Sequence, residues 1–162
     1  MLYSVIMSAH ICHARLNEHS LKERSGPRTL KKQADTIRGA CLMPYSAYLL
    51  TDEARHSLID RCPPRHPEVI AHHVTYAFPD DAPPPDASLV RVIGHAQDKR
   101  VDCVVVEVNG SHERPSGGVY HVTLSVDRSQ GGKPVLSNRL LKGGWVQLEP
   151  FTLTVTPSLV KT

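Results

Sequence analysis

Two copies of the tripeptide His-Val-Thr constrain the fold of this 162-residue chain more than any other feature. They occupy residues 73–75 and 121–123, and each lies in a run rich in β-branched and aromatic residues, which favours a strand. Successive side chains of a strand point to opposite faces. Each run therefore places one imidazole and one hydroxyl on one face of a sheet and its central valine on the other.

Two such strands lying side by side would gather His73, Thr75, His121 and Thr123 around one small space. One imidazole can remove a proton from an attacking oxygen while the other gives a proton to the leaving oxygen. The hydroxyls can donate hydrogen bonds to the non-bridging phosphoryl oxygens as charge develops there. This arrangement suits the cleavage of a phosphodiester and requires no metal. The alternative is a pair of half-buried sheet histidines whose threonine neighbours serve only strand propensity.

The motif pair is distinctive within this chain. Of the ten histidines, only His73 and His121 have Ser or Thr two residues further on. Strand alternation places Tyr76, Tyr120 and His72 on the faces opposite to these two histidines. We therefore expect both tyrosines to pack in the core rather than stack on a base, and we expect His73, not His72, to be the site residue.

Together with their flanking segments, the two motifs resemble the 2H phosphoesterases, a family named for two His-x-Thr/Ser motifs on the two lobes of a pseudo-symmetric sheet. The chain looks most like the compact cyclic phosphodiesterases found beside RNA ligase and kinase modules in RNA repair proteins. The resemblance runs from about residue 48 to about residue 160 and includes segments 66–72, 133–138 and 148–154. The motif histidines lie 48 residues apart, closer than in the larger members, which implies that one lobe is shortened.

The resemblance implies an α+β fold with a mostly antiparallel, pseudo-symmetric sheet and flanking helices. It also implies metal-independent hydrolysis of a 2′,3′-cyclic phosphate, or of a related cyclic or 2′-5′ linkage, at an RNA end or in a nucleotide, with no cofactor. His73 and His121 would be catalytic, and Thr75, Thr123 and Lys133 would bind the substrate. The sequence leaves open which histidine is the base, and Lys133 is equally well read as a solvated loop lysine.

Charge is divided unevenly along the chain. Residues 1–43 carry seven basic and three acidic side chains, whereas the remainder carries twelve and thirteen. We interpret residues 1–43 as a basic, flexible leader and residues 44–162 as the phosphoesterase-like domain. Proteins that bind long nucleic acids usually present a basic face, and the domain has no net positive charge to supply one. We therefore expect the partner to be an RNA end or a nucleotide rather than duplex DNA. We also expect the protein to be a monomer.

Hydrophobic patterning predicts the elements of the domain. A helix should begin after an N-cap at Thr51 and end at the prolines 63–64. The other expected elements are strands over 69–78, 88–96, 101–108 and 119–126, a short helix over 134–141, and strands over 145–148 and 151–156 separated at Pro150. The apolar run over 101–106 indicates a central strand buried on both faces.

Several features bear on location and on other functions. The chain has no apolar span of eighteen residues, which predicts no transmembrane helix, and residues 1–7 lack the basic lead of a signal peptide. The four cysteines form no C-x-x-C pair, so we expect a cytoplasmic protein with reduced thiols and no metal. Two other hypotheses remain: a non-catalytic RNA-end or nucleotide binding module of the same fold, and a scaffold that acts through the basic leader.

Overall fold

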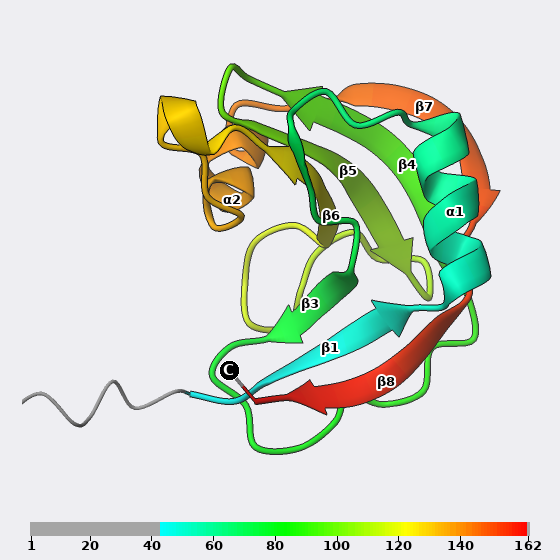
Figure 1. Ribbon diagram of the computed structural model, residues 1–162. Coiled ribbons are helices and arrows are strands. Elements are labelled where there is room, and N and C mark those ends of the chain that lie inside the picture. Colours follow the sequence, from blue (N-terminus) through cyan, green and yellow to red (C-terminus); the bar gives the residue numbers. More distant parts are fainter. Residues whose placement is uncertain (1–42, 162) are drawn as a thin grey trace, which may run out of the picture. The chain divides into compact units, whose positions relative to one another are not determined.

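The computed structural model describes residues 43–161, which form an α+β domain dominated by antiparallel strands (Figure 1). The basic leader over residues 1–43 lies outside the described residues except for Met43. Neither of the α-helices in the described part is long and apolar enough to cross a membrane. In chain order the elements are β1 (Tyr45–Leu50), α1 (Asp52–Arg61), β2 (Glu68–Val69), β3 (His73–Ala77), β4 (Val90–Gln97), β5 (Val101–Val108), β6 (His121–Val126), the 3-10 helix η1 (Arg128–Gln130), α2 (Leu136–Leu141), β7 (Val146–Thr152) and β8 (Val155–Val160).

The strands form two sheets rather than the one that we expected. One has the order β3-β1-β8 and the other the order β2-β6-β5-β4-β7, and the strand pairs in both are antiparallel. The chain changes sheets just before the first motif: Ile70 and Ala71 donate backbone hydrogen bonds to β6, whereas His73 pairs with β1. Ala71 adopts a φ of 39° at this change of direction. The predicted strand over 69–78 is therefore divided into β2 and β3.

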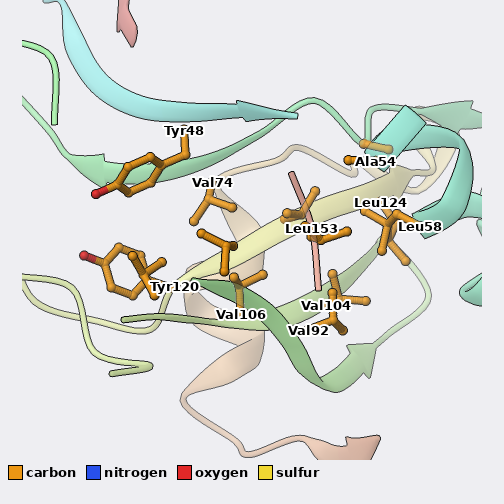
Figure 2. Packing of buried hydrophobic residues seen from close by; sticks show 14 residues of the cluster. Tyr48, Ala54, Leu58, Val74, Val92, Val104, Val106, Tyr120, Leu124 and Leu153 are labelled. Atoms are coloured by element: carbon orange, nitrogen blue, oxygen red, sulfur yellow. The ribbon is translucent and has the colours of Figure 1, made fainter. Parts of the chain in front are cut away.

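The main core lies between the two sheets (Figure 2). Tyr48 of β1 and Val74 of β3 pack there with Val106 of β5, and α1 contributes Ala54 and Leu58. Leu58 is fully buried, as is Val74. Burial of these side chains is the main force that holds the two sheets together.

Strand β5 is buried on both faces, which confirms the prediction of a central strand. Its residues Val104 and Val106 belong to the main core, whereas Cys103 and Val105 belong to a second apolar cluster. Leu141 of α2 packs in this second cluster. Because successive residues of β5 point to opposite faces, α2 covers the face of the five-stranded sheet that lies opposite to the main core.

The predicted start of α1 is confirmed, because the Thr51 hydroxyl accepts a hydrogen bond from the Ala54 amide at 3.2 Å.

The predicted break at Pro150 is wrong. Strand β7 runs through Pro150, and the chain leaves it only at Leu153 and Thr154. Proline is tolerated there because β7 is an edge strand, and Pro150 lies where its pairing with β4 shifts register.

Candidate active site

A pocket of about 670 Å³ opens where β3 and β6 meet, on the face of these strands opposite to the main core. Side chains from β1, β3, β6 and α2 and from the loop between β5 and β6 line it. The lining residues with polar side chains are Tyr45, His73, Thr75, Arg114, Ser116, His121, Thr123, Asn138 and Lys142. The imidazoles and hydroxyls of both motifs therefore lie in one pocket, although their strands belong to different sheets.

The valine at the centre of each motif points away from this pocket. Val74 and Val122 are fully buried in the main core, so the alternation predicted for both motif strands is confirmed. Tyr120 is buried in the same core and Tyr76 packs against it, which confirms that both tyrosines serve packing. Each motif thus anchors its strand with one side chain and presents two polar side chains to the pocket.

His121 is held in one tautomer by its own backbone. Its Nδ1 lies 2.8 Å from the Val119 carbonyl oxygen, and because a carbonyl only accepts hydrogen bonds, Nδ1 carries the proton. Burial lowers the pKa of His121; the Val119 contact opposes this shift, and the nearby charge of Arg114 adds to it. The ring is therefore neutral at neutral pH and has its lone pair on Nε2, as a general base requires.

His73 has a different environment. Its Nε2 lies 3.5 Å from the Tyr45 hydroxyl and its Nδ1 lies 3.0 Å from Nδ1 of His72. Burial lowers the pKa of His73 to about 4, and repulsion from His72 and His121 adds to the shift. Both rings are therefore neutral in the empty pocket at neutral pH.

His72 precedes β3 rather than belonging to it. It is exposed and does not line the pocket, as alternation suggested, but its ring meets that of His73 edge to face at an interplanar angle of 84°. Strand alternation does not predict this contact, because it describes directions within a strand and His72 lies before β3.

A buried hydroxyl orients Thr123. The Thr123 Oγ1 lies 2.9 Å from Oγ of Ser137, which is fully buried at the second residue of α2. Thr75 makes no side-chain hydrogen bond within residues 43–161, so its hydroxyl is available to a ligand. Ser137 belongs to the segment over 133–138 that carried part of the family resemblance, but no pattern singles it out from its neighbours.

Lys133, the cationic residue that the sequence pointed to, does not line the pocket. Lys133 is exposed and is not among the lining residues, whereas Arg114 and Lys142 are. The Arg114 guanidinium donates to Asn138 Oδ1 at 2.8 Å, and its Nε is buried without a hydrogen-bond partner in the described part of the chain. A Cβ at Gly118, where φ is +83°, would meet Arg114 Nη2 at 2.7 Å. Glycine at this position therefore makes room for the guanidinium.

Within the described residues, no group of three or more His, Cys, Asp or Glu side chains could hold a metal ion. Comparisons of the chain with protein-family models, with curated proteins and with solved structures found no match. A function is therefore inferred from the pocket and its two motifs.

Proposed function

We propose that this protein is a metal-independent phosphodiesterase of the 2H type. Its substrate is a 2′,3′-cyclic phosphate at an RNA end or in a nucleotide, or a related cyclic or 2′-5′ linkage. The observation that carries this proposal is the presence of two imidazoles and two hydroxyls, from two copies of one tripeptide, in a single pocket. The pocket volume of about 670 Å³ falls within the range typical of small-ligand sites.

The two histidines have distinct roles in this reaction. His121 is the base: its Nδ1 proton is held by the Val119 carbonyl, so Nε2 accepts the proton of the attacking water. His73 is the acid, and its Nε2 gives a proton to the departing ribose oxygen. Water attacks phosphorus, the bond from phosphorus to the ribose oxygen breaks, and a phosphomonoester remains.

The hydroxyls and Arg114 act on the developing charge. Thr75 and Thr123 donate hydrogen bonds to the non-bridging oxygens, and Ser137 keeps the Thr123 hydroxyl in place. Arg114 places a positive charge in the pocket wall. Guanidinium groups bind phosphate oxygens through paired, charge-assisted hydrogen bonds.

A substrate panel tests the proposal. The purified full-length protein is incubated in chelator with 2′,3′-cyclic nucleotides, RNA with a cyclic phosphate end and 2′-5′-linked dinucleotides. Turnover of at least one of these is expected, with the same rate when chelator is omitted. Binding without turnover would instead favour a non-catalytic module that recognises RNA ends, and turnover lost in chelator would favour a metal mechanism.

Arg114→Gln is expected to raise KM by about 10- to 100-fold, because a hydrogen bond to a charged group contributes about 1.5–3 kcal/mol. Lys133→Gln is the matched variant, and a change in KM below about twofold is expected because Lys133 lies outside the pocket lining. Initial rates give KM, and thermal unfolding shows whether loss of the bond to Asn138 disturbs the fold. A larger effect at Lys133 would show that the exposed loop lysine, rather than Arg114, binds the phosphate.

A further inference from the structure

The two adjacent histidines at the start of β3 form a pair. Their Nδ1 atoms lie 3.0 Å apart, their ring centroids 5.2 Å apart, and the rings are nearly perpendicular. His72 is exposed, whereas His73 lines the pocket. The contact therefore links the inside of the pocket to solvent through two groups that both take up and release protons.

Only one of the two facing Nδ1 atoms can hold the proton of this hydrogen bond. When it is on His72, neutral His73 carries its own proton on Nε2; when it is on His73, the Nε2 of neutral His73 has a lone pair. When a proton moves between the two Nδ1 atoms, the His73 Nε2 therefore changes between a protonated donor and an unprotonated acceptor. No carboxylate is hydrogen-bonded to either ring within residues 43–161, so His72 is the hydrogen-bond partner of this Nδ1.

This contact addresses a difficulty in the proposed mechanism. The acid must donate from Nε2, yet burial and the charges of His72 and His121 hold the pKa of His73 at about 4. The Tyr45 hydroxyl of β1 also faces this ring, and its own pKa is raised by burial, so it stays protonated. A doubly protonated His73 is therefore rare at neutral pH, and the departing oxygen needs another source of protons.

We infer, on the basis of the proposed function, that His72 is a positioning residue that holds the His73 ring and relays to it the proton that His73 gives to the leaving oxygen. In this step His73 Nε2–H breaks as the new O–H bond forms on the ribose oxygen. At the same time the Nδ1 proton of a His72 imidazolium moves to Nδ1 of His73. Both rings end neutral, with the His73 proton on Nδ1. His73 Nε2 then takes a proton from water as Nδ1 returns its proton to His72, which restores the starting state of the pair.

Two variants separate the relay from simple ring positioning. His72→Asn keeps a polar group that can hydrogen-bond Nδ1 of His73 but cannot relay a proton, and His72→Leu removes both properties. His56→Asn is the control, because His56 is another exposed histidine and lies outside the pocket. We expect kcat at neutral pH to fall about tenfold in His72→Asn and about 10- to 100-fold in His72→Leu, less than the roughly 10²- to 10⁴-fold contribution of a group that itself transfers the proton to the substrate, while KM changes less than about twofold.

The dependence on pH and buffer distinguishes a relay from a structural defect. In His72→Asn the kcat should begin to fall at a lower pH than in the wild type, because only direct protonation of His73 remains. Added imidazole should partly restore kcat in His72→Leu and leave the wild type unchanged. A wild-type kcat in His72→Asn across this pH range, with no response to imidazole, would overturn the relay and leave the proposed phosphodiesterase intact.

Imidazole ¹⁵N spectra of the full-length protein provide a readout that needs no turnover. The His72 and His73 signals should titrate as a coupled pair, and the pKa of His73 should rise in His72→Asn because the repulsion is removed. Independent titration of the two rings would overturn the inference whatever the activity. Coupled titration in a protein that hydrolyses no substrate would leave the electrostatic link between His72 and His73 in place and reject both the proposed function and the relay that depends on it.

Discussion

His121→Ala is expected to lower kcat by about 10²- to 10⁴-fold, the usual contribution of a positioned acid or base. The ring is almost fully buried, with 7% of the residue exposed, and its Nδ1 is already bonded to Val119. No other imidazole that lines the pocket has its lone pair fixed on Nε2 in this way. Water would then attack without a base, whereas substrate binding through Arg114 and the threonines would persist, so KM should change little.

The pH profile of kcat/KM shows whether the His121 imidazole, which His121→Ala removes, is the base. A base acts only when it is unprotonated, and burial holds the pKa of His121 below the ordinary value of 6.5. Wild-type kcat/KM should therefore fall as the pH is lowered through that pKa, and His121→Ala should lack this acid limb. His56→Ala serves as the control. If His121→Ala retained kcat within about threefold of the wild type, a two-histidine mechanism would be untenable.

The parts of the site that the sequence predicted are those that depend on local geometry. Alternation within a strand correctly predicted that Val74 and Val122 point away from the His and Thr side chains of their motifs. The valines are buried in the core, and the His and Thr side chains line the pocket. The Thr51 cap and the apolar run in β5 are likewise local signals. Such features follow from short-range rules that do not need the tertiary fold.

The parts that were missed depend on contacts between distant segments. Strand β1 pairs with β8, which follows it by more than a hundred residues, and its own sequence shows no clear alternation. The chain changes sheets at Ala71, which has a positive φ. An alanine in the sequence does not predict this backbone conformation, because positive φ is uncommon outside glycine. Arg114 reaches the pocket from the loop between β5 and β6, where its guanidinium lies beside Gly118. None of these three features can be read from a local pattern.

A buried carboxylate holds the segment that leads into the first motif. Asp102 of β5 is fully buried, and its oxygens lie 2.6 Å from His95 Nε2 and 3.2 Å from the Ser125 hydroxyl. The same carboxylate accepts a hydrogen bond from the Arg65 backbone amide at 3.0 Å. Through these bonds, Asp102 joins the connection between α1 and β2 to β4, β5 and β6 of the larger sheet.

Asp102→Ala is expected to reduce the free energy of unfolding by about 3–5 kcal/mol, because it removes the buried acceptor of the His95 ring and the Ser125 hydroxyl and one of the two acceptors of the Arg65 amide. This loss is a large fraction of the 5–15 kcal/mol typical of a domain. Urea titration would measure it, and Asp60→Ala, at an exposed position of α1, should change stability by less than about 0.5 kcal/mol. Equal stability of the two variants would mean that His95 and the Arg65 amide find other partners. The connection before β2 would then be held by the Ser125 hydroxyl, by the contact of the His66 ring with the Asp98 carbonyl and by the β2–β6 pairing.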